Sequence, residues 1–567
     1  MFRNLLYSAF GLLGSREAKA LELASLNPAA AQLEKLLAII SANAETVYGK
    51  EHGFASIKTV ADFQNAVPIN EYDNLQPYIT RVSEGEQNVL TSEMPFMFAT
   101  TSGTTGARKL IPITRSYVKE FRKASVSSGY HLLRSFPGVR KGVTLSVFSP
   151  AEEGRTPAGI PYGAISGRLY LEEPALVKKY VSPLPYELFL IKDYESRYYT
   201  MLRCALMLPI SSIYTLNPST IVVLARRLNV YAERLIEDVA KGTLKPPVEL
   251  PDQIRAALQK FLKPAPKRAA ELKKLLATGQ FKPRKIWKEL SLICCWTKAA
   301  AAFYLQDLPE YFDDLPVCDI TYGASEGRGT VCIAPGKQLL SLRSHFFEFV
   351  PENQLGSGER PLLAHEVTVG ESYYILFTTS GGLYRYNIND IVKIAGWHNQ
   401  APLLEFLHKG GNISSFTGEK LTESQVTDAV SAATKVCGVK LRFFTVIPKF
   451  RPEPHYELWC ESFSAETARQ VNPEIIEKLR QEFDQQLRLM NIEYDAKRQS
   501  DRLADTTVEF LNIGAYEDLR KHLVSSGVPD AQVKVSHLNP KEEIHGFLEK
   551  YCQQTAPLRA IESQRNS

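Results

Sequence analysis

Residues 98–112 read FATTSGTTGARKLIP, and this stretch says more about the protein than any other part of the chain. It places four hydroxyl side chains and two glycines in six consecutive positions, which are Thr101, Ser102, Gly103, Thr104, Thr105 and Gly106. Glycine lets the backbone adopt positive φ and approach a ligand closely, while backbone N–H groups and hydroxyls bind anions. The motif predicts a polyphosphate cradle, although it lacks the glycine spacing and the Lys-Ser/Thr pair of a Walker loop. A plain turn between a strand and a helix is the alternative.

A second segment, TYGASEG at 321–327, follows an apolar run that ends at Ile320. Glu326 lies in this glycine-bounded turn, and Mg²⁺ prefers hard oxygen ligands together with phosphate partners. The turn therefore predicts a magnesium ligand, and a simple capped turn is the alternative.

Two more segments complete the set. Residues 384–392 read YRYNINDIV, and Asp390 could accept hydrogen bonds from ribose hydroxyls, as acidic residues do in other nucleotide sites. A turn carboxylate paired with Arg385 is the alternative. Residues 417–423 read TGEKLTE, and Thr422 is expected to begin a helix.

In this order the four segments resemble those of the adenylate-forming enzymes and, more closely, of the Gretchen Hagen acyl-acid amido synthetases, which join a carboxylic acid to an amino acid. Residues 43–54, 67–72, 85–90 and 346–351 also resemble stretches of that family, so the resemblance covers most of the chain. It implies an α/β fold with a large N-terminal adenylation domain at 1–412, whose β-sheets are flanked by helices. A smaller, mobile α+β domain follows at 413–567.

The resemblance also implies site residues. The nucleotide would contact Thr101, Ser102, Gly103, Thr104, Thr105, Gly106, Gly163, Tyr322, Gly323, Ala324, Ser325, Glu326 and Asp390. Glu326 would also be catalytic as the Mg²⁺ ligand, and Ser166 and Arg168 would touch the acyl substrate. Lys534 would reach the nucleotide during adenylation, but Ser536 and His537 replace the Pro-Arg that follows it in the family. A solvated lysine on an edge strand is the alternative for Lys534.

The resulting hypothesis is a two-step ligase that uses ATP and Mg²⁺. A small carboxylic acid forms an acyl-adenylate, and the amine of an amino acid then displaces AMP. Arg328 and Arg168 depart from the family, whose members often have apolar or small residues nearby, and an arginine at the acyl pocket could bind a second acidic or polar group on the acid. A salt bridge away from the substrate is the alternative. His345 is a candidate base for the amine, with a structural histidine as the favoured interpretation.

Three other functions are weighed against this hypothesis. An acyl-CoA ligase shares the adenylation step, and a non-catalytic, nucleotide-dependent acid sensor shares the binding site. Residues 241–289 are rich in Lys, Arg and Pro, which could indicate nucleic-acid binding. Their apolar residues recur at helical spacing, so the solvated face of surface helices is favoured.

Composition sets the remaining expectations. A chain of 567 residues exceeds one compact core, and 44% hydrophobic and 23% charged residues with a net charge of +5 are ordinary for a globular protein. Eight cysteines without a CxxC motif favour buried thiols and a cytoplasmic protein. No run approaches the ~20 apolar residues of a membrane span, and residues 5–13 are taken as part of a packed helix rather than a signal peptide. We expect a monomer that binds neither nucleic acid nor membranes.

The secondary-structure pattern predicts a helix-rich first hundred residues, followed by alternating strands and helices. Particular expectations are strands at 143–148 and 373–379, and one helix from Pro218 to about Ala240. Glycines 410 and 411 mark a hinge. Beyond it the pattern predicts strands at 441–447, 456–460 and 507–512 and a helix at 473–489.

Overall fold

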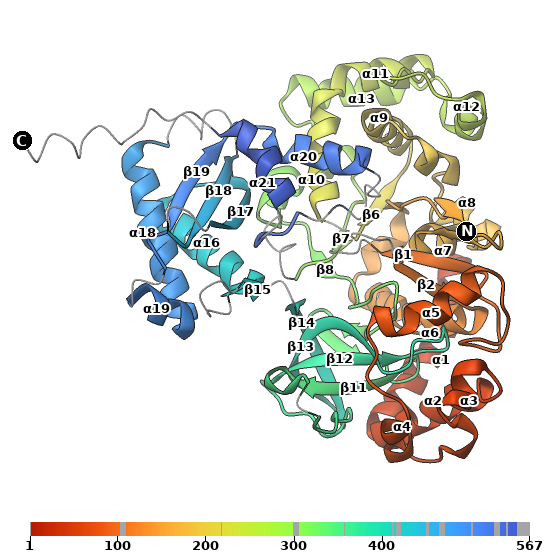
Figure 1. Ribbon diagram of the computed structural model, residues 1–567. Helices are drawn as coiled ribbons and strands as arrows, with labels where there is room; N and C mark the ends of the chain where they lie inside the picture. Colours follow the sequence, from red (N-terminus) through yellow and green to blue (C-terminus); the bar gives the residue numbers. More distant parts are fainter. Residues whose placement is uncertain are drawn as a thin grey trace, which may run out of the picture. The chain divides into compact units, whose positions relative to one another are not determined.

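Two units make up the chain, Met1–Leu407 and His408–Ser567, and each is described by itself (Figure 1). The computed structural model describes residues 2–101, 109–216, 218–298, 305–356, 358–410, 413–414, 421–449, 453–463, 471–499, 503–526, 533, 535–539 and 542–552. The expected boundary between residues 412 and 413, and the functions assigned to the two sides of it, stay predictions.

Helices form the beginning of the first unit, as expected. They are α1 (Phe2–Leu26), α2 (Pro28–Ala42), α3 (Val47–Glu51), α4 (Val60–Ala66) and α5 (Tyr72–Ser83). Asn27 caps α2 by accepting a hydrogen bond from the Ala30 N–H at 3.1 Å, and Pro28 fits the first helical position because it has no N–H to satisfy. None of the helices in the described part of the chain has the length and apolarity needed to cross a bilayer.

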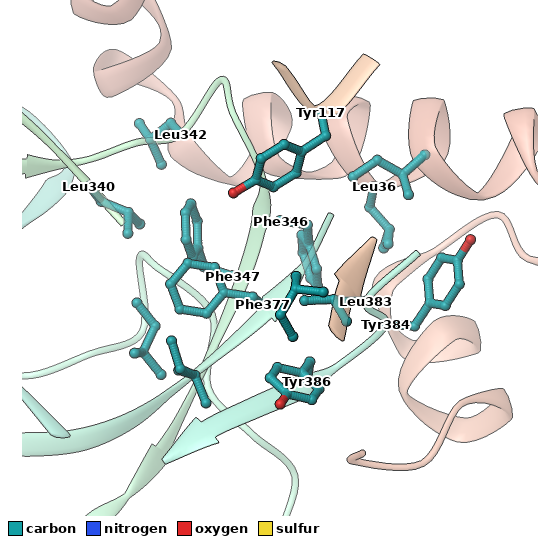
Figure 2. Packing of buried hydrophobic residues seen from close by; sticks show 14 of the residues in the cluster. Leu36, Tyr117, Leu340, Leu342, Phe346, Phe347, Phe377, Leu383, Tyr384 and Tyr386 are labelled. Atoms are coloured by element: carbon teal, nitrogen blue, oxygen red, sulfur yellow. The ribbon is translucent and has the colours of Figure 1, made fainter. Parts of the chain in front are cut away.

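A six-stranded sheet lies next to these helices and holds much of the core. Its order is β11-β12-β13-β14-β10-β9, with bounds Phe346–Pro351, Ser372–Thr378, Tyr386–His398, Ala401–Lys409, Lys337–Leu340 and Thr330–Ala334. The expected strand at 373–379 is thus β12. Figure 2 shows Phe346, Phe347 and Phe377 gathered below Tyr117, and the rings of Phe347 and Phe377 meet edge to face at 5.2 Å. Burial of these rings joins the sheet to α2 and to α6 (Arg115–Ser135).

A second sheet is entirely parallel and positions the site. Its strands β3 (Val143–Ser146), β6 (Ile210–Tyr214), β7 (Leu292–Cys295) and β8 (Val317–Asp319) follow one another in that order. They are short and largely buried, as expected for parallel strands covered by helices. Because the strands run the same way, their carboxyl ends share one edge, where ligands of α/β proteins bind.

The helix expected from Pro218 to about Ala240 is instead two helices, α10 (Pro218–Val230) and α11 (Ala232–Lys241). The break falls at Tyr231, whose hydroxyl donates to Glu195 at 2.6 Å and whose ring meets that of Tyr199 at 5.2 Å. Both partners belong to α9 (Tyr194–Ala205), so a tertiary contact that local periodicity does not encode coincides with the interruption.

Residues 241–289 form helices whose apolar side faces inward. In α12 (Asp252–Leu258) and α13 (Pro266–Ala277), Ile254, Leu258 and Leu272 are buried in one hydrophobic cluster. Their basic residues therefore form the outer face, as the helical spacing predicts.

The second unit is a three-stranded sheet covered by helices, as expected for a smaller α+β domain. The strands are β17 (Leu441–Lys449), β18 (His455–Ser462) and β19 (Thr507–Leu511), and the principal helices are α16 (Glu423–Cys437), α18 (Pro473–Met490), α19 (Ile492–Gln499) and α20 (Ala515–Ser525). Thr422 begins α16 with a capping box, because its hydroxyl accepts from the Gln425 N–H and the Gln425 side chain accepts from the Thr422 N–H.

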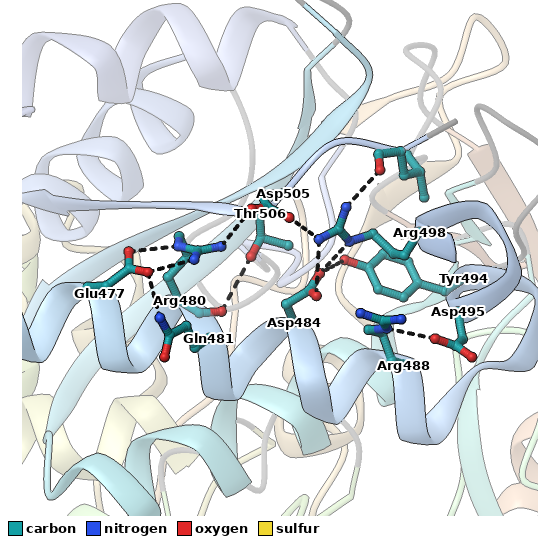
Figure 3. Close-up of polar contacts among 11 residues, drawn as sticks. Glu477, Arg480, Gln481, Asp484, Arg488, Tyr494, Asp495, Arg498, Asp505 and Thr506 are labelled. Carbon is teal, nitrogen blue, oxygen red and sulfur yellow. Dashed lines mark hydrogen bonds and ion pairs between the residues drawn. The ribbon is translucent and has the colours of Figure 1, made fainter. Parts of the chain in front are cut away.

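An ion-pair network ties the helices of this unit together (Figure 3). Asp484 of α18 accepts hydrogen bonds from the Tyr494 hydroxyl at 2.6 Å and from Arg498 Nε at 2.8 Å, both of which belong to α19. The Asp484 and Arg498 side chains are only 10% and 9% exposed. Arg498 also pairs with Asp505, whose side chain is 68% exposed, so loss of Asp484 leaves the enclosed guanidinium with only this exposed partner.

We predict that Asp484→Ala lowers the free energy of local opening of α18 by about 3–5 kcal/mol, which is the usual cost of breaking a buried pair. Amide hydrogen exchange of α18 in the full chain measures this energy. Glu477→Ala, which removes an exposed partner of Arg480 on the same helix, is the matched control and should cost less than about 1 kcal/mol. Equal losses in the two variants would contradict the prediction.

Candidate active site

The hydroxyl-rich loop joins two antiparallel strands. Thr101, the last residue of β1 (Met97–Thr101), pairs with Lys109, the first residue of β2 (Lys109–Ile113). The alternative of a strand-to-helix turn is therefore wrong. Ser102, Gly103, Thr104, Thr105 and Gly106 lie outside the described residues, so their contacts with phosphate stay predictions.

Gly163 lies beside the strand that leads into this loop. It ends β5 (Pro161–Gly163), which runs parallel to β1 and pairs Gly163 with Ala99. A Cβ at position 163 would lie 2.5 Å from the Ala151 carbonyl oxygen, so a side chain cannot be added without moving backbone. The fold thus requires glycine where the family resemblance places a residue close to ATP.

The two predicted acyl-contact residues lie on α7 (Ile165–Leu171), directly after β5. Ser166 is half-buried in the first turn of this helix. Arg168 Nε donates to Glu172 at 3.1 Å, and Glu172 also accepts from Arg115 and Arg122. Arg168 therefore belongs to a surface ion-pair network, and its contact with the acyl substrate stays a prediction.

Residues 322–328 form a closed turn after β8, at the carboxyl edge of the parallel sheet. Gly323 and Arg328 form an isolated antiparallel bridge, and the Ala324 N–H donates to the Gly327 carbonyl at 2.9 Å. The Tyr117 hydroxyl donates to the Ser325 carbonyl at 2.8 Å and so attaches the turn to α6. Short-range and tertiary hydrogen bonds together fix the backbone that carries Glu326.

Glu326 itself is buried, with 7% of its surface exposed. Burial, and after it the negative charge of Glu326, raise the pKa of the Tyr117 and Tyr386 hydroxyls, which stay neutral donors near the carboxylate. Among the described residues no group of three or more His, Cys, Asp or Glu side chains could hold a metal. A single carboxylate suits Mg²⁺, which takes one or two protein carboxylates and completes its shell with phosphate oxygens and water.

Asp390 faces this turn from another sheet. It lies in β13, and its Oδ2 accepts a hydrogen bond from the Tyr322 hydroxyl at 2.7 Å, with both residues buried. Burial and the charge of Asp390 raise the pKa of Tyr322 well above its usual value, so the hydroxyl remains a donor. The proposed ribose ligand and the proposed adenine neighbour are thus brought together from distant parts of the chain.

The alternative in which Asp390 pairs with Arg385 is wrong. Arg385 Nε donates instead to Glu348, at 3.1 and 3.0 Å from the two carboxylate oxygens, and both side chains are at most 5% exposed. This pair belongs to the core, where Arg385 also donates to the Val67 carbonyl at 2.6 Å.

His345 has a structural role, as favoured from the sequence. It is fully buried, and its Nε2 accepts the Arg328 backbone N–H at 3.0 Å. Burial lowers its pKa to about 3, so the ring is neutral near pH 7. An imidazole whose acceptor nitrogen is already occupied inside the core cannot take a proton from an amine substrate.

Three family descriptions match consecutive parts of this chain. They are the GH3 family N-terminal domain at 17–317, the GH3 family central domain at 338–409 and the GH3 family C-terminal domain at 424–543. The chain belongs to the GH3 family. The resemblance inferred from the four sequence segments is confirmed.

Related GH3 proteins match along nearly their whole length. The probable indole-3-acetic acid-amido synthetase GH3.1 of Arabidopsis thaliana is 27% identical over 530 residues, which cover 88% of each chain. The jasmonoyl–L-amino acid synthetase JAR4 of Nicotiana attenuata is 26% identical over 528 residues, covering 89% of this chain and 90% of that protein. The solved AtGH3.15 acyl acid amido synthetase in complex with 2,4-DB is 20% identical and superimposes with a TM-score of 0.84, covering 94% of this chain and 96% of that one. The expected α/β fold with a larger N-terminal and a smaller C-terminal domain is confirmed.

Lys534 lies outside the described residues of this GH3 protein, but the residues that follow it are firmly attached. Ser536 Oγ donates to Glu423 at 2.8 Å, and the Val446 N–H donates to the His537 carbonyl at 2.7 Å. The two residues that replace the family's Pro-Arg therefore anchor this segment to α16 and β17. No sequence signal indicated these contacts, because the partners are more than ninety residues away.

We predict that Tyr322→Phe raises the KM for ATP roughly 10-fold or more, because Asp390 loses a hydrogen bond of the charge-assisted kind. The ring and its packing are retained, so the folded state should persist. ATP-dependent pyrophosphate release measures the KM, and Tyr130→Phe on α6 is the matched control. If the KM for ATP were unchanged, the Tyr322–Asp390 pair would have no part in nucleotide binding.

Proposed function

We propose that this GH3 protein is an ATP-dependent acyl-acid amido synthetase that adenylates a small carboxylic acid and transfers the acyl group to the amine of an amino acid. The observation that carries the proposal is the Tyr322–Asp390 pair beside Glu326 at the carboxyl edge of the parallel sheet. The names of its relatives, which conjugate indole-3-acetic or jasmonic acid, support the reaction class. These names do not identify the acid that this chain uses.

In the first step a carboxylate oxygen attacks the α-phosphorus of ATP, the new O–P bond forms, and the bond to pyrophosphate breaks. Both reactants are anionic, so the site must offset charge and hold an in-line geometry. Residues 101–106 would hold the phosphates beside Gly163, Asp390 would bind the ribose hydroxyls, and Tyr322 would border the adenine. Lys534 would offset charge that develops at the α-phosphate.

Mg²⁺ fits this site as a second cofactor. Glu326 would hold it together with phosphate oxygens, and the ion would supply positive charge against the phosphates.

In the second step the amine nitrogen attacks the acyl carbonyl carbon, the C–N bond forms, and AMP leaves with the electrons of the C–O bond. The amine must lose a proton, and His345 is unsuited to accept it. Rotation of the domain at 413–567 between the two steps would exchange the residues that face the adenylate, a common role of domain motion in catalysis.

We also infer the cellular compartment and the oligomeric state of the protein. The eight free cysteines, six of them buried, suit a reducing compartment such as the cytoplasm. We also infer a monomer, since one chain contains both domains that the two steps need.

The decisive experiment measures AMP and pyrophosphate release from ATP, with mass detection of products, across aryl, indolyl, aliphatic and dicarboxylic acids offered with pooled amino acids. Amide product together with AMP would support the proposal. AMP release that requires CoA would favour an acyl-CoA ligase instead. ATP binding without turnover of any acid would favour the acid sensor.

We predict that Glu326→Gln lowers the kcat of adenylation by roughly 100-fold, because a neutral amide is a poorer Mg²⁺ ligand than a carboxylate. The amide keeps the size of the side chain, and the enclosing turn should survive. Pyrophosphate exchange at several Mg²⁺ concentrations is the measurement, with exposed Glu352→Gln as the control. An unchanged rate and magnesium dependence would exclude Glu326 as the ligand.

A further inference from the structure

Within the described part of the chain, every group that Arg328 contacts is neutral. Its terminal nitrogen donates to Ser125 Oγ at 3.0 Å, and its guanidinium lies 4.6 Å from the centre of the Phe121 ring. The Tyr214 hydroxyl is close enough to act electrostatically on the guanidinium. Arg328 Nε, which is buried, has no hydrogen-bond partner. No carboxylate among the described residues pairs with it, so the expected alternative of a salt bridge is absent from the described chain.

Three other enclosed arginines in the described residues have partners that compensate their charge. Arg385 pairs with Glu348, and Arg498 pairs with Asp484. Arg203 is fully buried, and backbone carbonyls of Asp238, Thr243 and Phe261 accept its hydrogen bonds.

The neighbours of Arg328 do not supply a negative charge by titration. Burial raises the pKa of both Tyr214 and Tyr117, the two titratable groups that act on it, so both stay neutral near pH 7. Arginine keeps its charge under all ordinary conditions. An enclosed guanidinium without an anion costs folding free energy, and a bound anion would offset that cost.

The location of Arg328 connects it to the proposed reaction. Tyr214 is the last residue of β6, and the turn that carries Arg328 follows β8, so both lie at the carboxyl edge of the parallel sheet. A Cβ at Gly323 would lie 3.1 Å from Arg328 Cδ, which places the side chain against the proposed nucleotide turn. Phe121, Ser125, Tyr214 and Arg328 are each half-buried, so each keeps part of its surface exposed.

We propose that Arg328, with the hydroxyls of Ser125 and Tyr214, binds a second negatively charged group on the acyl substrate, so that this enzyme prefers dicarboxylic acids. This inference rests on the proposed function. A guanidinium bound to the reacting carboxylate would lower its nucleophilicity and lose its partner when the adenylate forms. A second carboxylate keeps the ion pair through both steps, and arginine binds carboxylates in a fixed, two-pronged geometry.

The test compares acids that differ only in the second carboxylate, namely hexanoate with adipate and benzoate with terephthalate or isophthalate. Pyrophosphate release gives kcat/KM for each acid with saturating ATP and pooled amino acids. In the natural enzyme at least one diacid should exceed its monoacid roughly 30-fold or more, as expected for an enclosed charge pair. A preference for the monoacid in every pair would overturn the inference.

The ratio of diacid to monoacid kcat/KM is then measured in variants. Arg328→Met should bring the ratio close to one, and Arg328→Lys should restore part of it. Tyr214→Phe should lower the ratio several-fold and tests the same site if Arg328→Met does not fold. Arg134→Met, an exposed arginine at the other end of α6, is the control that keeps the ratio of the natural enzyme.

Two outcomes distinguish failure of the inference from failure of the proposed function. If Arg328→Met lowers kcat/KM for both acids equally, Arg328 binds the reacting carboxylate and the inference is overturned. If no acid is turned over, calorimetry in the presence of ATP measures whether terephthalate or adipate binds, and this result separates the two failures. Binding that Arg328→Met abolishes would overturn only the proposed reaction, whereas no diacid binding would overturn the inference as well.

Discussion

A buried hydrogen bond between Tyr322 and Asp390 joins the six-stranded sheet to the turn after the parallel sheet, and the candidate site depends on it. Tyr322 follows the last strand of the parallel sheet, whereas Asp390 lies within the antiparallel β13. A carboxylate in such a place is costly unless it is hydrogen-bonded. The Tyr322 hydroxyl supplies one such hydrogen bond, to Asp390 Oδ2.

The same constraint, that an enclosed polar group must find partners, explains the surroundings of the turn. His345 is held neutral by burial, and its acceptor nitrogen is used on the Arg328 backbone, so a residue that looks catalytic in the sequence supports the turn instead. Gly163 lies where neighbouring backbone leaves no room for a side chain. Structural side chains thus fix the backbone that carries Glu326 and Asp390, the two carboxylates proposed to bind ligands.

Arginine shows how one residue type serves different purposes in this chain. Arg385 and Arg498, whose side chains are both enclosed, are each paired with a carboxylate, and their role is structural. Arg328 lies among hydroxyls and an aromatic ring at the edge where ligands bind. Arg328 thus differs from Arg385 and Arg498 in its partners rather than in burial alone.

The sequence alone determined the family, the α/β class and most of the secondary structure, because these depend on local patterns. Thr422 predicted the beginning of a helix through its capping chemistry, and apolar spacing predicted strands such as β12 and β17. The order of the four segments was enough for the GH3 family, which the family match confirms.

Only the tertiary structure decided which charged groups meet. Asp390 lies five residues from Arg385 in the chain, yet it bonds to Tyr322, sixty-eight residues away, while Arg385 pairs with Glu348. Alternating side chains of a strand point to opposite faces, and a left-handed residue such as Arg385 changes that alternation, so proximity in sequence does not predict an ion pair. Whether two residues from separate sheets become hydrogen-bond partners depends on how the whole unit packs. A local sequence pattern does not contain that information.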